Sequence, residues 1–311
     1  MIDKISVIIT AHNRREFLPH AIASVINQSL DRDLFEVVVV KNFSDQNTDQ
    51  VINDNGFKSI IVSDNTNVGY DLYEGIVNTT GEVICFLDDD DLFQRNKLKV
   101  VYEKFATDEG LSFFKHNVLL IDENGNAIQR KRRLSIGKDV KIPPSEFNKK
   151  VSFFHFVKAD FNLTSMSVRR SSIRDNYLRF LRDSLSYSTD TFFFSLAMSS
   201  NKAVYLSSEK LSSYRLHNSS SHSGGISEDS LFDKLTFWGK LIDSYNVFLN
   251  LFDAPSRPFI QNRIFAQMLA MQMLSKRANK VLHYDVPLRK IFVYSIKERD
   301  VLLLYDLLRC L

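Results

Sequence analysis

Cysteine is scarce in this chain, which has two among 311 residues and therefore no disulfide framework. Cys85 lies inside an apolar run and is expected in the core, and this usage of cysteine favours a reducing compartment. No uncharged apolar stretch reaches about 18 residues, so no membrane-spanning helix is expected. Because Met1 leads directly into a strand pattern, no signal peptide is expected either. These absences predict a cytoplasmic protein, either free or peripheral to a membrane.

A large charge of one sign is also missing. The formal net charge is +3, which is too small to indicate nucleic-acid binding by itself. Internal repeats are absent, and only residues 218–225, which are rich in serine, read as a flexible loop. With 44% hydrophobic and 25% charged residues, the composition is that of an ordinary soluble globular protein. The length allows one or two domains.

The first hundred residues alternate between two patterns. Short β-branched or apolar runs predict buried strands, and apolar residues at helical spacing between them predict helices. This alternation is typical of βαβ units, so the expected fold class is α/β with a mostly parallel sheet and flanking helices. The predicted strands are residues 5–10, 35–40, 59–62 and 83–87, and the predicted helices are 18–26, 48–55 and 70–78.

The strand at 83–87 ends abruptly in four carboxylates, Asp88-Asp89-Asp90-Asp91. Ligands of open α/β sheets bind beyond the carboxyl ends of the strands, so these acids lie where a ligand is expected. Carboxylates this close repel one another, and a divalent metal that also grips phosphates is the natural compensating cation. The alternative is that Asp91 caps the next helix and the other acids are solvated.

The second part of the chain is less regular. Residues 111–121 are strand-like, and Asn124-Gly125 predicts a hairpin turn after them. The returning segment carries a basic cluster at 130–133, which is either a solvated hairpin face or a surface for an anionic acceptor or lipid head groups.

From residue 229 onward the pattern is helical throughout. Apolar stripes, one of them through Trp238 and Tyr245, are expected to pack internally or to form a dimer face rather than a binding site. Association of this tail with a membrane surface is a further option. A boundary is expected near residue 225.

Six pieces of the sequence form a pattern when they are taken in order: residues 6–14, 38–45, 65–69, 86–91 with a DxD signature, 188–192, and Tyr214-Arg215-Leu216-His217. A lone pair of acids would be a weak signal, but six pieces over roughly the first 220 residues are specific. Together they resemble the inverting GT-A glycosyltransferases of family 2, and only the helical tail is left uncovered.

The resemblance implies an enzyme that moves a sugar from a nucleotide-diphosphate donor to a hydroxyl of a saccharide or lipid-linked acceptor. It implies a GT-A domain at 1–225, with a nucleotide-sugar half at 1–110 and an acceptor half at 111–225, and a helical extension at 226–311. Lys41 and Asn42 replace acids that are common in the family, so a uracil base is not implied. The residues implied to bind the donor are Thr10, Ala11, His12, Asn42, Gly69, Asp88 and Asp89.

The resemblance also implies a divalent metal, Mn²⁺ or Mg²⁺, with Asp90 as its direct ligand. His217 and Arg215 would contact the metal or the diphosphate. Asp190 is the implied general base, which would accept the proton of the attacking hydroxyl in a single, inverting displacement. An alternative hypothesis makes Asp190 the N-cap of the following helix. Asp160 and Asp183 are the alternative candidates for the general base.

Two other functions fit paired acids at strand ends. A nucleotidyltransferase would normally have a glycine-rich, lysine-bearing loop after its first strand, but residues 11–14 contain neither glycine nor lysine. A non-catalytic scaffold that binds sugar nucleotides or glycans is favoured slightly by Lys41 and Asn42, whereas the intact acids and Asp190 favour an enzyme. The tail helices would mediate a homodimer, and no nucleic-acid partner is expected.

Overall fold

The computed structural model describes residues 2–64, 66–129, 135–217, 228–277, 286–298 and 300–310, without the side chains of 228–232 and 277. The basic cluster at 130–133, the serine-rich loop at 218–225 and Asn65 lie outside the described residues. Within the described ranges, no helix combines the length and the apolar character that a bilayer crossing requires.

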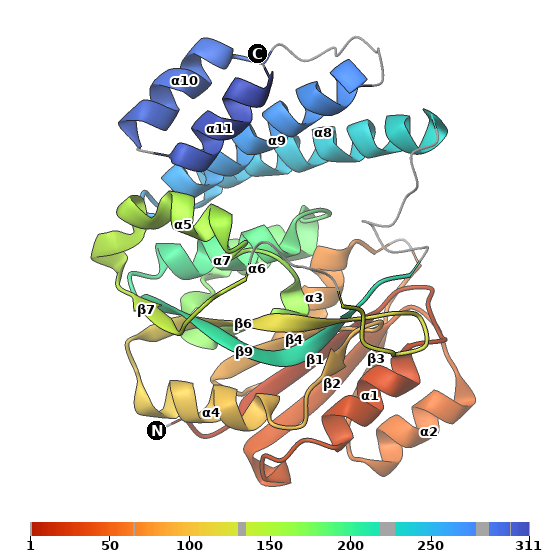
Figure 1. The fold of residues 1–311 in the computed structure, drawn as a ribbon. Helices are drawn as coiled ribbons and strands as arrows, with labels where there is room; N and C mark the ends of the chain where they lie inside the picture. Colours follow the sequence, from red (N-terminus) through yellow and green to blue (C-terminus); the bar gives the residue numbers. More distant parts are fainter. Residues whose placement is uncertain are drawn as a thin grey trace.

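Strands and helices alternate through the first part of the fold, as the sequence pattern predicts (Figure 1). Asp88 still belongs to the fourth strand, so the acid cluster begins on the strand itself. The elements are β1 (Ile5–Ala11), α1 (Leu18–Ile26), β2 (Phe35–Lys41), α2 (Gln46–Asp54), β3 (Lys58–Ile61), α3 (Val68–Val77), β4 (Val83–Asp88), β5 (Leu92–Phe93) and α4 (Lys97–Thr107).

One sheet runs through the molecule in the order β3-β2-β1-β4-β8-β6-β9-β5, with β7 (Val140–Ile142) beside β9. The first four strands in this order pair in parallel. Beyond them, β8 (Met166–Arg169) is antiparallel to both of its neighbours, and β6 (Leu111–Ile121) pairs in parallel with β9 (Ala203–Arg215). The α/β prediction is confirmed, and the parallel part of the sheet is the part that carries the acids.

The sheet separates two apolar layers. In β4, Ile84 and Phe86 face one layer, whereas Val83, Cys85 and Leu87 face the other. This alternation follows from the two-residue period of a strand, and burial of both faces explains why the strand reads as a continuous apolar run. The helices α1, α2 and α4 cover one face, and α3, α6 (Asp175–Asp183) and α7 (Thr189–Ser199) cover the other (Figure 1).

The C-terminal helices extend the second apolar layer. Phe248 and Phe252 lie 5.8 and 5.3 Å from Phe192, measured between ring centroids, and Phe259 lies 4.8 Å from Phe194. Such aromatic contacts join the predicted helical tail to the body of the fold. Figure 1 shows the helices of the tail on the side of the molecule above α7. The helices of this half are α5 (Val151–Phe156), α6 (Asp175–Asp183), α7 (Thr189–Ser199), α8 (Glu228–Leu251), α9 (Arg257–Arg277), α10 (Leu288–Lys297) and α11 (Val301–Cys310).

Candidate functional site

Parallel pairing brings the ends of β1, β2 and β4 to one edge of the sheet. Thr10 lies beside Val40 on one side and Asp88 on the other. The backbone N–H of Asp89 donates to the carbonyl oxygen of Thr10 at 3.2 Å, and Ala11 pairs with Lys41. Thr10, Ala11, Asp88 and Asp89 are therefore neighbours despite their separation in the sequence.

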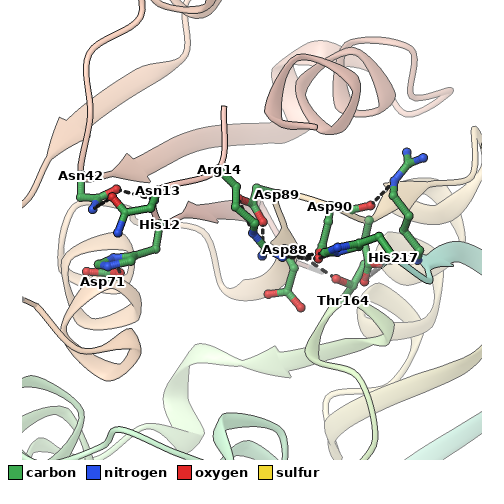
Figure 2. Close-up of polar contacts among 12 residues, drawn as sticks. His12, Asn13, Arg14, Asn42, Asp71, Asp88, Asp89, Asp90, Thr164 and His217 are labelled. Carbon is green, nitrogen blue, oxygen red and sulfur yellow. Dashed lines mark hydrogen bonds and ion pairs between the residues drawn. The ribbon is translucent and has the colours of Figure 1, made fainter. Parts of the chain in front are cut away.

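The guanidinium group of Arg14 lies among the acids (Figure 2). Its Nη1 donates to Asp90 Oδ2 at 2.6 Å, while Nε and Nη2 donate to the two carboxylate oxygens of Asp89 at 3.3 and 2.5 Å. Arg14 thus supplies positive charge where the sequence predicts only a metal. The sequence does not single out this residue, although a cation at the end of the strand next to β4 is a signal that could have found it.

His217 reaches the same acids from the end of β9. Its Nε2 lies 2.8 Å from Asp90 Oδ2 and 3.5 Å from Arg14 Nη1 (Figure 2). The ring of Phe17 lies 5.2 Å away and fixes the other side of the imidazole. The structure therefore brings together the two residues that the sequence predicts as metal ligands.

Asp90 and His217 form a donor set that fits a divalent cation. A carboxylate oxygen and an imidazole nitrogen both suit Mn²⁺, and Mg²⁺ is usually held by one or two carboxylates together with phosphate oxygens and water. Within the described residues, no group of three or more histidine, cysteine, aspartate or glutamate side chains is arranged to hold a metal. The remaining ligands of a bound cation would therefore have to come from a diphosphate and from water.

Burial dominates the electrostatics of the acids. It raises the pKa of Asp88 well above its ordinary value, and the charges of Asp91 and Asp90 raise it further. Burial also raises the pKa of Asp89 to about 8, although the charge of Arg14 opposes this shift. A divalent cation would favour the ionised forms, so the cluster is matched to a strong positive charge.

Asp91 is a structural residue. Its Oδ2 accepts a hydrogen bond from Asn162 Nδ2 at 2.8 Å, and its Oδ1 accepts one from the backbone N–H of Arg215 at 3.0 Å. The N-cap position of α4 is Asn96, so the reading of Asp91 as the cap of that helix is wrong. Asp91 instead ties the end of β4 to the end of β9.

Arg215 holds backbone carbonyl groups next to the acids. Its side chain donates to the backbone carbonyl oxygens of Asp90, Asp122 and Glu123 at 2.8 to 3.1 Å. The predicted turn after β6 is present, and Arg215 holds it against the acid cluster. These bonds use Nε and Nη1 of the guanidinium group, and the contact of Arg215 with the metal or the diphosphate stays a prediction.

Asn42 lies in a second polar group, at the end of β2 (Figure 2). Its Nδ2 donates to Asn13 Oδ1 at 2.9 Å and to Asp64 Oδ1 at 3.1 Å, and its Oδ1 accepts from the backbone N–H of Asn13 at 2.8 Å. Lys41 turns away from this group, because its buried Nζ pairs with Asp49 at 2.7 Å. Of the two departures from the family pattern, only Asn42 faces the predicted base site.

His12 stands beside this group with 40% of its side chain exposed, and its Nδ1 lies 3.9 Å from Asp71 Oδ2. An exposed imidazole at the end of β1 is available to stack on a planar ligand.

Gly69 has a packing role that the sequence does not reveal. A Cβ atom at this position would lie 2.5 Å from the carbonyl oxygens of both Leu181 and Leu185. The Gly69 N–H donates to Leu185 at 3.0 Å, so α3 begins in direct backbone contact with the chain that follows α6. The absence of a side chain allows this close approach.

A cavity of about 620 Å³ joins the acids to Asp190, because Arg14, Asp88, Asp90 and Asp190 all line it. Asp190 lies in the first turn of α7, where its Oδ1 accepts from the N–H of Thr191 at 2.9 Å. The N-cap position is Ser188, so the reading of Asp190 as the N-cap is wrong.

Burial raises the pKa of Asp190 to about 6, and the charge of Asp160 adds to this shift. Arg263 of α9 lowers the pKa in opposition. A carboxylate with this pKa is partly protonated just below neutral pH, which suits a group that takes up a proton.

The two alternative bases are less suitable. Asp160 also lines the cavity, but its Oδ2 accepts from Thr191 Oγ1 at 2.7 Å and lies 3.0 Å from Arg263 Nε. Asp183 is exposed and paired with Arg182. Among the three candidates for the general base, Asp190 is thus the one that lines the cavity and forms no salt bridge with another described residue.

The tail helices form a wall of this cavity, which the sequence pattern does not predict. Trp238 and Tyr245, which belong to one of the apolar stripes, line the cavity, so the stripe does more than pack internally. A periodic apolar stripe shows which face of a helix is apolar, but not whether a core or a cavity lies opposite that face. We call this surface the helical wall: Lys234, Phe237, Trp238, Leu241 and Tyr245 of α8, and Arg263 of α9.

The model of the family described as "Glycosyl transferase family 2" matches residues 6–178, which is more than half of the chain. The chain belongs to this family. The match favours a glycosyltransferase over a nucleotidyltransferase, and it ends before Asp190, His217 and the helical wall.

A GalNAc(5)-diNAcBac-PP-undecaprenol β-1,3-glucosyltransferase of Campylobacter jejuni is 29% identical over 185 residues, which are 56% of this chain and 53% of that protein. The matched segments span about half or less of the length of the curated relatives.

Solved structures show the same GT-A fold. TarS 1–349 of S. aureus has a TM-score of 0.62 at 16% identity, over 97% of this chain and 86% of that one. The mannosyltransferase PcManGT of Pyrobaculum calidifontis, in complex with GDP-Man and Mn²⁺, has a TM-score of 0.55 at 12% identity, over 98% and 85%. The predicted fold is therefore confirmed, including the helical C-terminal region.

Proposed function

We propose that this protein transfers a sugar from a nucleoside-diphosphate donor to an acceptor hydroxyl, with assistance from a divalent metal and inversion at the anomeric carbon. The observation that carries the proposal is the cavity that Asp88, Asp90 and Asp190 line together, in a chain of glycosyl transferase family 2. The family relation supports sugar transfer, and the arrangement of the acids supports the finer mechanism.

The donor would lie along the strand ends. Thr10, Ala11, His12 and Asn42 would hold the nucleoside, with His12 stacking on the base. Gly69 would contribute through the close packing that places the start of α3. Asp88 and Asp89 would face the ribose and the ligands of the metal. Because Asn42 can both donate and accept hydrogen bonds, this arrangement does not restrict the base to uracil.

Asp90 and His217 would hold Mn²⁺ or Mg²⁺. The bound ion would stabilise the diphosphate as a leaving group by Lewis-acid catalysis. Arg14 now bridges Asp89 and Asp90, and it would be free to turn toward the diphosphate once another cation neutralises these carboxylates. The Mn²⁺ present with PcManGT supports a metal of this kind.

Asp190 would act as the general base. Its carboxylate would accept the proton from the acceptor hydroxyl while that oxygen attacks the anomeric carbon from the side opposite the diphosphate. The transition state would have oxocarbenium character, as in glycoside hydrolysis. One displacement at one carbon gives inversion.

The predicted division into a glycosyltransferase domain at 1–225, with its halves at 1–110 and 111–225, and an extension at 226–311 belongs to this proposal. We also propose a cytoplasmic location and association through a surface on the last helices.

Exposed apolar residues on these helices favour such an association surface. Ultracentrifugation and vesicle flotation would distinguish a homodimer from membrane association. These residues are Phe292, Val293, Ile296, Val301, Tyr305 and Leu308.

A panel of nucleoside diphosphates, with Mn²⁺ and with chelator, tests the function. Ligands that bind the folded state raise its apparent thermal stability, so a matching nucleotide should stabilise the protein only when metal is present. The corresponding nucleotide sugar should then be hydrolysed slowly or transferred. Stabilisation by no nucleotide, or binding without any turnover, would contradict a glycosyltransferase.

A further inference from the structure

We propose that the helical wall is the acceptor subsite, and that it selects a sugar carrying a phosphate group. This inference rests on the proposed sugar transfer. Its starting observation is that the wall lines the same cavity as Asp190, so a sugar held there can present a hydroxyl to the proposed base. The volume of about 620 Å³ lies within the range of roughly 300–1,000 Å³ that ligand sites occupy.

Trp238 gives the wall a surface for a sugar ring. Its indole lines the cavity and is half-buried, next to the half-buried Phe237 and Leu241. A sugar ring has apolar C–H faces and polar edges, so it can lie against an aromatic face while its hydroxyls stay hydrated or bonded. Trp238 and Leu241 also pack against the apolar core, which anchors this part of α8.

Lys234 gives the wall its positive charge. It is exposed, one helical turn before Trp238, and its Nζ lies 5.4 Å from the centroid of the Trp238 ring. Among the described residues Lys234 forms no salt bridge. An ammonium group on a flexible stem beside an aromatic face can bind a phosphate on the sugar that stacks there.

Three other cations line the cavity, and each of them has a partner. Arg14 is paired with Asp90, and Arg263 is paired with Asp160. Lys158 is engaged as well, with its Nζ 5.6 Å from the centroid of the Phe161 ring. The positive charge of Lys234, in contrast, remains available to an anionic ligand. A phosphate compensates such a charge with charge-assisted hydrogen bonds, which are roughly twice as strong as neutral ones.

Tryptophan fluorescence can test this directly, because Trp238 is the only tryptophan in the chain. The probes are the 1-phosphates of glucose, galactose, mannose and N-acetylglucosamine, the methyl glycosides of the same sugars, and inorganic phosphate. At least one sugar phosphate should change the emission at a concentration about tenfold or more below that of its methyl glycoside, since a hydrogen bond to a charged group contributes about 1.5–3 kcal/mol. Inorganic phosphate alone should have little effect.

Two variants on α8 identify the charge responsible. Lys234→Gln should abolish the preference for the phosphate and raise the acceptor KM while leaving nucleotide affinity unchanged in calorimetry. Lys240→Gln is the matched control, because Lys240 is also exposed and also lies 5.4 Å from an aromatic ring, that of Tyr187, but does not line the cavity. This control should bind the probes like the unmodified protein.

The outcomes separate this inference from the proposed function. If the nucleotide binds and its sugar is hydrolysed, but no sugar phosphate changes the emission, the subsite assignment is overturned and the function stands. Equal preference in Lys234→Gln and the unmodified protein would also overturn it. If no nucleotide binds, the result contradicts the proposed function, on which the subsite assignment rests.

A sugar phosphate linked to a short prenyl chain distinguishes the two sources of such an acceptor. Tighter binding than that of the free sugar phosphate would identify a lipid-linked acceptor, and equal binding a soluble one. Either result agrees with recognition of a phosphate-bearing sugar.

Discussion

The two sides of the cavity are built in different ways. On the strand-end side, the acids are buried or half-buried, and Arg14 pairs with Asp89 and Asp90. On the helical wall, half-buried aromatic rings and the exposed Lys234 face the same space. The match to the family model covers the strand-end acids and stops before the wall. In the proposed function, the strand ends bind the donor and the tail helices bind the acceptor.

The largest effect on activity is expected at Asp190, which lies in the cavity between the strand ends and the helical wall. Asp190→Asn keeps the size of the side chain but removes its ability to accept a proton. Because general base catalysis typically contributes about 10²–10⁴-fold, transfer should fall by that factor while nucleotide affinity stays unchanged in calorimetry. Asp183→Asn, at an exposed acid that pairs with Arg182, is the control and should be as active as the original protein. Lost nucleotide binding in Asp190→Asn would move this residue to the donor side.

A change on the strand-end side should act on binding instead. Asp90→Asn removes the proposed carboxylate ligand of the metal. Loss of even a supporting residue costs a metal site roughly 10–100-fold in affinity, so Mn²⁺-dependent nucleotide binding should fall at least this far in calorimetry. The exposed Asp33, changed to Asn, is the control. Equal nucleotide affinity with Mn²⁺ and with chelator in the original protein would contradict the metal assignment.

Arg263, on the tail helix α9, is expected to position the proposed general base Asp190 from the other side of the cavity. Arg263→Gln removes the partner of Asp160, which holds Thr191 next to Asp190. We expect kcat to fall about tenfold, less than the roughly 10²-fold cost of a misplacement by a full 1 Å.

The pH profile separates positioning from mere loss of packing in this variant. Because the charge of Arg263 lowers the pKa of Asp190, its removal should move the acidic limb of the profile to higher pH. Arg263→Lys keeps the charge and should restore the position of that limb. A profile that does not move in Arg263→Gln would leave Arg263 with a packing role alone.

The acidic limb itself is a further test of Asp190. A base works only when deprotonated, so kcat/KM should rise with pH and reach half of its plateau near pH 6, where burial places the pKa of Asp190. Below that pH the rate should fall about tenfold per unit, as for any single titrating group. The Asp190→Asn variant should lose this limb, and its persistence would assign it to another group.

The smallest effect concerns stability on the strand-end side. Gly69→Ala would place a Cβ atom 2.5 Å from two backbone carbonyl oxygens, and overpacking of this kind costs about 1–3 kcal/mol. Urea denaturation should show this loss. Gly137→Ala is the matched control, because nothing lies within 4 Å of its added Cβ. Equal stability of the two variants would show that the start of α3 can shift to make room.

The sequence by itself determined the alternating strands and helices, the acid cluster at the end of β4 and the family. These features are local, because a short apolar run indicates a buried strand and the polar residues after it indicate where the strand ends. Asp88 to Asp90, His217 and Asp190 can be proposed as site residues from the sequence alone, because each lies in a contiguous piece that resembles a known pattern.

Only the tertiary structure decided how these pieces act on one another. Sequence spacing does not show that Arg14 bridges Asp89 and Asp90, that Asp91 is a tie between strands, or that Gly69 touches the chain after α6. It also does not show that Trp238 faces a cavity, because periodicity gives the direction of an apolar stripe but not what lies opposite. Contacts between segments far apart in the chain arise from packing, and packing decided which polar groups are neutralised and which remain available to a ligand.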